Sequence, residues 1–279
     1  MRVIRWWTGG RFFGICGYGH LSSLPHRTVK EIWGRATLDG MLQLWRAAER
    51  YRGGDVEAGI DTRHAFSFAG FYDPANVRFG PLVACNEERL AVGAGFPRHR
   101  HRDIEIVTWV TAGLLAHEDP HGRVTHVRPG DLQRLSAGTD GVVHAERNAG
   151  TDPLRFVQMW LLPEAECGDG RGVERDAREP EYELVRGIAD STPYAMPRTD
   201  ATLHVRRLSA GGRTALPCSA RVYVHVVRGL VRVAGETLEA GDAARIAGPL
   251  GDGAAYLAVP GDSEAELLVW EMGTEPAYG

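Results

Sequence analysis

Long apolar runs, paired cysteines and an excess of positive charge are all absent from this 279-residue sequence. No segment approaches the roughly 18 consecutive apolar residues of a transmembrane helix. The four cysteines lie far apart without a CxxC pair, so neither a disulfide framework nor a thiolate zinc site is indicated. A net charge of −4 argues against a protein held on nucleic acid by phosphate contacts. We therefore expect a cytoplasmic protein with neither a membrane nor nucleic acid as a direct partner.

The first forty residues differ from the rest of the chain. Basic residues outnumber acidic ones there, and three of the seven tryptophans lie in this stretch. Arg11 and repeated glycines interrupt the apolar region that a secretory signal needs. A membrane-surface arm is one alternative, although no apolar stripe of helical spacing is sustained. We interpret residues 1–40 as an N-terminal extension, disordered or outside the native protein, with Met41 as the natural start.

From Ile104 onward the sequence is typical of an all-β protein. Short runs such as "IEIVTWVT", "RFVQMWLL", "RVYVHVV" and "AELLVWEM" are rich in β-branched and aromatic residues, and Gly, Pro and Asp separate them. No long segment has a convincing 3.6-residue period. Many short strands with closely spaced turns predict a sandwich or a barrel.

A weak internal repeat predicts two similar barrels. Aligning Gly113 with Gly229 brings the Gly-Asp pair that starts at Gly130 into register with the pair that starts at Gly241, after a short gap. The stretch between the halves is charged and rich in glycine, as linkers often are.

The predicted domain organisation follows from this repeat. Residues 41–165 form an N-terminal metal-binding barrel, 166–188 a linker, and 189–279 a C-terminal barrel that lacks metal ligands.

Two short motifs carry the candidate chemistry. Alternate residues of a strand share a face, so His99, His101 and Glu105 are expected to point the same way, successive same-face positions about 7 Å apart. Roughly forty residues later, His144 and Glu146 form a second same-face pair. If the two strands are neighbours, three imidazoles and a carboxylate meet at one point. Such a set suits Fe, Mn, Ni, Cu or Zn better than Ca or Mg. A single HxH motif is also common on solvent-facing strands; the second motif favours a site.

These motifs resemble the two signatures of the pirin family of bicupins. The first signature, HPHRxxE, is matched by "HRHRDIE", which begins at His99; the second, RPGD…SAG…HSE, is matched by "RPGD", "SAG" and "HAE". The resemblance is strong from about Leu42 to about Pro163, thinner toward the C-terminus, and absent from residues 1–40. It implies an all-β fold of two tandem, jelly-roll-like cupin barrels.

The resemblance also implies the site residues. The metal ligands would be His99, His101, His144 and Glu146, and Glu105 would accept a hydrogen bond that orients a histidine. The cofactor would be one divalent transition metal, with Fe²⁺ the first expectation and Mn, Ni, Cu or Zn left open.

Two departures from the family pattern lie beside the motifs. Arg100 stands where the family usually has proline, which should loosen the strand entrance and add charge near the metal. The loop "SAGTDGVVHAE" is one residue longer than the common form, with Asp140 at its tip. Neither removes a ligand, but both could alter which substrate enters.

The function implied by the resemblance is that of a quercetin 2,3-dioxygenase. Such an enzyme opens the heterocyclic ring of a flavonol with O2 and releases carbon monoxide, and here Glu146 would be the general base. The alternative is a non-catalytic, metal-dependent regulator that binds a transcription factor or a metabolic enzyme. A different metal-dependent reaction, or a metal-free barrel that binds a small aromatic molecule, also remains open.

The remaining histidines and cysteines are interpreted as structural. His225 is expected to be a satisfied strand residue, and His117, His121 and His126 to belong to a solvated hairpin. Cys85 is expected to be a buried thiol without a catalytic partner.

Overall fold

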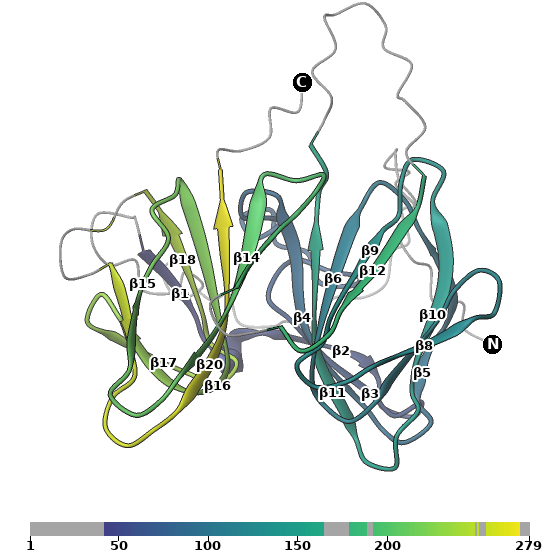
Figure 1. Cartoon of the computed structure of the whole chain (residues 1–279), viewed down its shortest axis with the longest axis horizontal. Coiled ribbons are helices and arrows are strands. Elements are labelled where there is room, and N and C mark those ends of the chain that lie inside the picture. Colours follow the sequence, from purple (N-terminus) through teal and green to yellow (C-terminus); the bar gives the residue numbers. More distant parts are fainter. Residues whose placement is uncertain (1–41, 165–178, 189–191, 249, 251–254, 274–279) are drawn as a thin grey trace, which may run out of the picture.

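The computed structural model contains two β-barrels side by side (Figure 1). The helical element of its described part is one turn of 3₁₀ helix, η2 (Ala47–Glu49). Within that part, no helix has the length and apolar character needed to cross a membrane. The expected extension and most of the expected linker fall outside it. The structure describes residues 42–164, 179–188, 192–248, 250 and 255–273.

The first barrel is built from a seven-stranded and a four-stranded antiparallel sheet. The seven-stranded sheet has the order β12 (Glu181–Val185), β9 (Leu132–Ser136), β6 (Glu105–Ala112), β11 (Leu154–Leu161), β4 (Leu82–Leu90), β3 (Ile60–His64) and β2 (Tyr51–Asp55). The smaller sheet has the order β5 (Gly95–His101), β10 (Val142–Asn148), β7 (Leu115–Glu118) and β8 (Val124–Val127).

The second barrel is a nine-stranded sheet that closes through the long strand β16 (Arg221–Val233). Its main path runs β1 (Leu42–Trp45), β18 (Ala243–Ala247), β16, β20 (Ala265–Met272), β14 (Ala201–Leu208) and β13 (Pro193–Ala195). The strands β15 (Arg213–Ala215), β17 (Glu236–Glu239) and β19 (Tyr256–Ala258) complete it through pairings with β16 and with one another.

Two segments leave the barrel or linker to which the sequence assigned them. Strand β1, expected in the first barrel, pairs with β18 of the second, where Leu42 lies opposite Ile246. Strand β12, expected within the linker, pairs with β9, where Glu181 lies opposite Ser136. Both are edge strands, and an edge accepts any segment that satisfies its backbone groups. Pairing partners of this kind depend on tertiary packing rather than on local sequence.

Strand β6 shows why strands of the first barrel have nearly continuous apolar sequences. Ile106 and Val110 pack inside that barrel, whereas Val107 and Trp109 pack against the second barrel. Both faces of the strand are therefore buried, which removes the polar alternation of a one-sided sheet.

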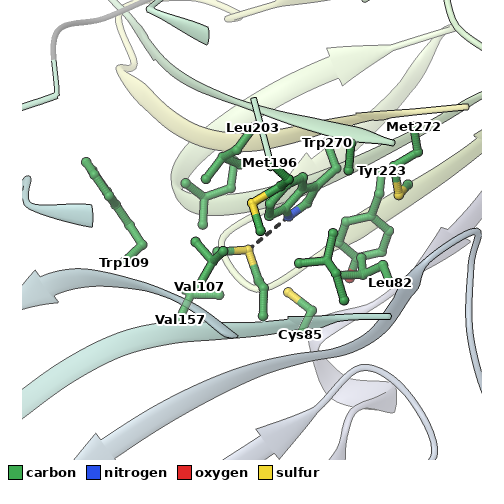
Figure 2. Close-up of a cluster of buried hydrophobic side chains, with 14 of the residues drawn as sticks. Leu82, Cys85, Val107, Trp109, Val157, Met196, Leu203, Tyr223, Trp270 and Met272 are labelled. Atoms are coloured by element: carbon green, nitrogen blue, oxygen red, sulfur yellow. Dashed lines mark hydrogen bonds between the residues drawn. The ribbon is translucent and has the colours of Figure 1, made fainter. Parts of the chain in front are cut away.

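A hydrophobic core fills the interface between the barrels (Figure 2). Val157 and Cys85 contribute from the first barrel, and Leu203 and Trp270 from the second. The indole N–H of Trp270 points at the sulfur of Met159, with 3.1 Å between nitrogen and sulfur. Cys85 is fully buried, as predicted.

Polar contacts also cross the interface. The Nη2 atom of buried Arg50 lies 2.9 Å from Nδ1 of His225. Because a guanidinium only donates, His225 accepts at Nδ1 and carries its hydrogen on Nε2. Its Nε2 lies 3.3 Å from Oε1 of Glu87, on the first barrel. His225 is thus an interface residue, but its buried Nε2 has no hydrogen-bond partner among the described residues, so it is not the fully satisfied residue that the sequence predicted.

The shared core predicts a large loss of stability when its central indole is removed. We expect Trp270→Ala to lower the free energy of unfolding by about 3–5 kcal/mol, because the cavity spans both barrels. Val92→Ala, at a side chain that is 58% exposed, should change it by less than about 0.5 kcal/mol. Urea unfolding measures both. A loss for Trp270→Ala no larger than that of the control would show that the barrels do not depend on this contact.

Candidate metal centre

The pairing of β5 with β10 brings the two sequence motifs together. His99 lies directly opposite His144 in this antiparallel pair, and a register shift follows between His144 and Glu146. The ring centres are 4.5 Å apart for His99 and His144, and 5.0 Å apart for His101 and His144. Each of the three imidazoles offers a nitrogen within 4.8 Å of the others. Three imidazoles in this arrangement can hold a transition-metal ion.

The turn before β10 allows the two strands to approach closely. Gly141 has a positive φ of 80°, and a Cβ atom there would lie 2.6 Å from the carbonyl oxygen of His101. Only glycine avoids that clash. Arg100 extends across the same turn and donates to the carbonyl oxygen of Asp140. The two departures from the family pattern therefore contact each other beside the histidines.

The hydrogen-bond partners of the imidazoles leave nitrogen lone pairs available. Nδ1 of His99 lies 2.7 Å from the carbonyl oxygen of Pro97, so Nδ1 carries the hydrogen and the lone pair is on Nε2. Nε2 of His144 is buried and has no hydrogen-bond partner. An orphaned, buried imidazole nitrogen beside two other histidines fits a bound metal ion, which would satisfy it.

Burial keeps the imidazoles of His101 and His144 neutral. The pKa of His101 is lowered to about 3, mainly by loss of solvent and to a smaller extent by the neighbouring His99. Burial also lowers the pKa of His144 to about 3. A metal ligand must be unprotonated, so neither histidine has to lose a proton at neutral pH before it can bind an ion.

Glu146 is buried and is held by two amides. Its Oε1 accepts a hydrogen bond from Nε2 of Gln133 at 3.2 Å, and its Oε2 accepts one from Nε2 of Gln158 at 2.9 Å. A second group of possible ligand atoms, all within 4.8 Å, consists of His117, His144 and Glu146. His144 thus belongs to both groups. The sequence predicted that Glu146 would join His99, His101 and His144, whereas in the structure its carboxylate is grouped with His117 and His144.

The electrostatic surroundings keep Glu146 ionised. Burial alone would raise its pKa, but the adjacent imidazoles of His117 and His144 and the Gln158 amide outweigh that effect and hold the pKa well below its usual range. The centre therefore combines the neutral imidazoles of His101 and His144 with one buried carboxylate anion.

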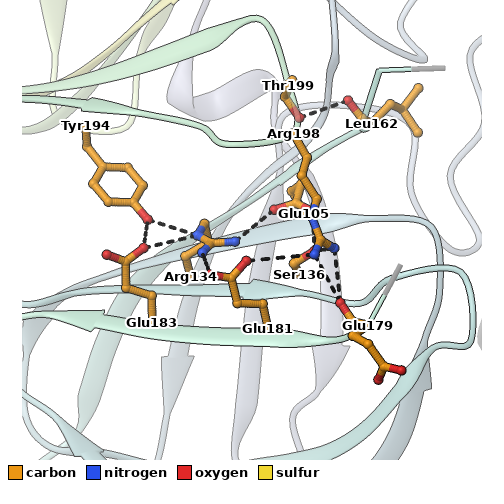
Figure 3. Close-up of polar contacts among 10 residues, drawn as sticks. All are labelled: Glu105, Arg134, Ser136, Leu162, Glu179, Glu181, Glu183, Tyr194, Arg198 and Thr199. Carbon is orange, nitrogen blue, oxygen red and sulfur yellow. Dashed lines mark hydrogen bonds and ion pairs between the residues drawn. The ribbon is translucent and has the colours of Figure 1, made fainter. Parts of the chain in front are cut away.

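Glu105 has surroundings different from those expected. Asp103 adopts a positive φ of 53° between β5 and β6, which breaks the strand alternation on which the expectation rested. The Glu105 carboxylate accepts from Ser136 at 2.5 Å and lies 3.5 Å from Nη1 of Arg134 (Figure 3). These contacts belong to a polar network that includes Glu181, and the hydrogen bonds of Glu105 go to Ser136 and Arg134 rather than to a histidine. Glu105 therefore does not orient a histidine.

His117 was assigned to a solvated hairpin, and that assignment is wrong. It is 2% exposed, whereas His121 and His126 are exposed as expected. In β7 it follows the apolar residues Leu115 and Ala116, both of them buried, and that continuous apolar run is the signal that could have located it.

The two glutamines that hold Glu146 were also missed. Gln158 interrupts the apolar run "FVQMWLL", and a polar residue in such a run indicates a buried hydrogen bond.

A second buried carboxyl group lies inside the first barrel. Glu88 on β4 accepts a hydrogen bond from the hydroxyl of Thr62 on β3, with 2.5 Å between the oxygens. Burial raises the pKa of Glu88 to about 8, and the negative charge of Glu146 adds to that rise. Glu88 is therefore largely protonated at neutral pH, in contrast to Glu146.

Two barrels, of which one carries inward histidines and a buried carboxylate, define a bicupin protein with a candidate metal centre. Comparison with known protein families agrees with this class. Residues 46–161 match the family model described as Pirin, and residues 197–272 match the model described as the quercetinase C-terminal cupin domain.

Individual relatives cover most of the chain. A Mycobacterium tuberculosis protein, provisionally named a quercetin 2,3-dioxygenase, is 36% identical over 248 residues, which are 83% of this chain and 95% of that protein. An Escherichia coli K12 protein named quercetin 2,3-dioxygenase is 30% identical and covers 83% of this chain and 99% of its own length. The crystal structure of the E. coli pirin YhhW in complex with nickel(II) has a TM-score of 0.69 and 28% identity, and covers 83% of this chain and 99% of that one.

The chain belongs to the pirin family. The predicted family and the predicted all-β, two-barrel cupin fold are both confirmed.

Glu88 predicts a specific pH dependence of stability. Its pKa is higher in the folded chain than the usual 4.5. The contribution of protonated Glu88 to the free energy of unfolding is therefore complete below about pH 4.5 and is lost as pH rises through about 8. Glu88→Gln keeps an acceptor for Thr62 but cannot ionise. The free energy of unfolding of the wild type should fall relative to this variant between pH 5 and 8, by at most about 1.4 kcal/mol per pH unit.

Urea unfolding of the metal-free protein across that pH range measures the difference. The control is Glu57→Gln, which removes an exposed carboxylate and should follow the wild-type pH profile. Equal pH profiles for the wild type and Glu88→Gln would contradict a buried, protonated Glu88.

Proposed function

We propose that this chain is a metal-dependent dioxygenase of the quercetin 2,3-dioxygenase type, which opens the heterocyclic ring of a flavonol with O2. Both oxygen atoms enter the ring-opened ester product, and the central carbon leaves as carbon monoxide. The observation that carries the proposal is the convergence of three imidazoles near a buried carboxylate. The names of the relatives support the same substrate class.

The residues that would hold one divalent ion are His99, His101, His144 and Glu146. Imidazole and carboxylate donors suit Fe²⁺, our first expectation, and equally Mn, Ni, Cu or Zn. The nickel(II) complex of a pirin relative supports a divalent transition metal. When bound, the ion would supply Lewis acidity toward the 3-hydroxyl and 4-keto oxygens of a flavonol.

Glu146 is the residue that we assign as general base. Glu146 would serve as the base when its carboxylate is dissociated from the ion; it shares a group of possible ligand atoms with His117 and His144, and amides of Gln133 and Gln158 fix both of its oxygens. An oriented, ionised carboxylate can accept the proton of the flavonol 3-hydroxyl. The resulting flavonolate is electron-rich, and electron density from it would reach O2 as the new carbon–oxygen bonds form.

Aromatic side chains beside the histidines suit a planar aromatic substrate. Half-buried Trp160 contacts His101 edge-on, with 4.9 Å between ring centres, and Phe68 lies 5.0 Å from Trp160. The indole N–H of Trp160 also donates to Oε1 of Gln158 at 3.1 Å, which links this ring to the support of Glu146. Aromatic faces favour stacked or edge-on contacts with another ring system.

The proposal predicts loss of flavonol that depends on both metal and oxygen. Protein loaded with each first-row metal in turn should consume quercetin in air, release carbon monoxide and stay inactive under nitrogen. Flavonol absorbance and headspace gas analysis measure this. Metal binding without turnover in any loaded form would contradict the enzyme and favour the regulatory alternative.

The assigned base predicts the effect of one conservative substitution. Glu146→Gln should lower kcat by about 10²–10⁴-fold, because the amide cannot accept the proton, while the variant keeps much of its metal binding. Glu118→Gln, on the neighbouring strand, is the matched control and should retain activity. If Glu146→Gln changes neither turnover nor metal content, Glu146 is not the base.

Trp160 predicts a change in substrate affinity. Trp160→Phe and Trp160→Leu both remove the indole N–H, but only the phenylalanine variant keeps an aromatic face. We expect KM for quercetin to be about 2–10-fold higher in Trp160→Leu than in Trp160→Phe, the range that an aromatic contact supplies. Steady-state kinetics measure the ratio. Equal KM values would show that the ring does not contact the substrate.

A further inference from the structure

His117 lies beside two residues of the candidate metal centre, His144 and Glu146. It lies on β7, where Glu146 of β10 is its cross-strand partner. Its Nδ1 lies 3.3 Å from Nδ1 of His144. Behind it, Tyr182 of β12 stacks on the ring, with 4.8 Å between centres and 27° between planes. The Tyr182 hydroxyl in turn lies 3.4 Å from Oε1 of Gln133.

Two facing Nδ1 atoms share one hydrogen. For a hydrogen bond to form, one ring must donate at Nδ1 and the other must accept there, because a neutral imidazole has one N–H and one lone pair. If His144 donates, its Nε2 has a free lone pair. If His117 donates, Nε2 of His144 carries a hydrogen and cannot bind a metal.

The surroundings favour His144 as the donor. Its Nε2 is buried without a hydrogen-bond partner, so a hydrogen placed there would be a buried, unsatisfied donor. His117 also interacts electrostatically with Glu146, but its Nδ1 lies 4.0 Å from Oε1 of Glu146 and only 3.3 Å from Nδ1 of His144, so the distance for a hydrogen bond is met at His144. The amides of Gln133 and Gln158 already bond both oxygens of that carboxylate.

We propose that His117 is a positioning residue whose Nδ1 accepts a hydrogen bond from Nδ1 of His144 and thereby fixes the His144 tautomer that exposes Nε2 to the metal. The inference rests on the proposed metal site. The Pro97 carbonyl oxygen does the same for His99. Partners of this kind orient metal-binding histidines and raise their basicity. Tyr182 would hold the His117 ring in place, which gives the predicted linker a part in the site.

The first test needs no metal. Long-range ¹H–¹⁵N correlation spectra of the metal-free, histidine-labelled protein report the tautomer of each ring. The wild type should show His144 with its hydrogen on Nδ1. His117→Phe keeps a ring of similar size but removes the acceptor, and His144 should then lose its fixed tautomer. His117→Asn keeps an acceptor near the Nδ1 position and should restore it. A wild-type His144 with its hydrogen on Nε2 would overturn the inference.

The second test measures affinity for Co²⁺ by competition with a chromophoric chelator. His117→Phe should weaken binding by about 10–100-fold, the usual cost of losing such a partner. His117→Asn should recover most of that loss, and His126→Phe, at an exposed histidine of the adjacent strand, should bind as the wild type does. A general packing role would not be rescued by asparagine, so equal loss in both His117 variants overturns the inference.

The outcomes separate this inference from the function on which it rests. No Co²⁺ binding by the wild-type chain would overturn both. Wild-type affinity in His117→Phe would overturn the role of His117 and leave the proposed function standing. Full metal binding without flavonol turnover, together with weakened binding in His117→Phe, would overturn the proposed reaction and support the role of His117.

Discussion

The antiparallel pairing of β5 with β10 is the constraint on which the candidate centre depends. The two motifs are about forty residues apart, and this pairing sets His99 directly opposite His144. Because side chains alternate along a strand, a slip of one residue would turn the histidines of one motif out of the barrel. Gly141 permits the close approach at the end of the pair, and Arg100 spans the same turn to Asp140. Register and turn chemistry therefore act together to define the centre.

Inside the first barrel, buried polar groups fix one another's orientation. Gln133 and Gln158 hold Glu146, and Trp160 holds Gln158. Each of these groups would cost free energy if it were buried without a partner, so the network specifies one arrangement. The interior cluster of the second barrel is instead filled by Val, Leu, Ile and Ala. One barrel thus carries candidate chemistry, and the other supplies an apolar core and half of the interface.

Much of this organisation can be predicted from sequence because it depends on local patterns. Strand composition gives the all-β fold, and the HxH and HxE motifs give the residues of β5 and β10. The surroundings of these motifs depend on long-range pairing instead. His117 lies in the centre because β7 pairs with β10, and β12 brings in Tyr182 from a segment whose composition resembles a linker.

The expectation for Glu105 failed for a related reason. A single left-handed residue at Asp103 changes which face follows the HxH motif, and strand alternation assumes that no such residue intervenes. The contacts of Glu105 with Ser136 and Arg134 place it in the wall near the second barrel. A residue can thus match a sequence motif although its contacts in the structure differ from those that the motif implies.

The most direct test of the account is to locate a bound metal by anomalous diffraction from crystals of protein loaded with a single divalent ion. We predict one peak in the first barrel, about 2.0–2.2 Å from Nε2 of His99 and of His144 and from a nitrogen of His101. A peak bound by other residues, or none at all in protein exposed to excess metal, would contradict the central claim.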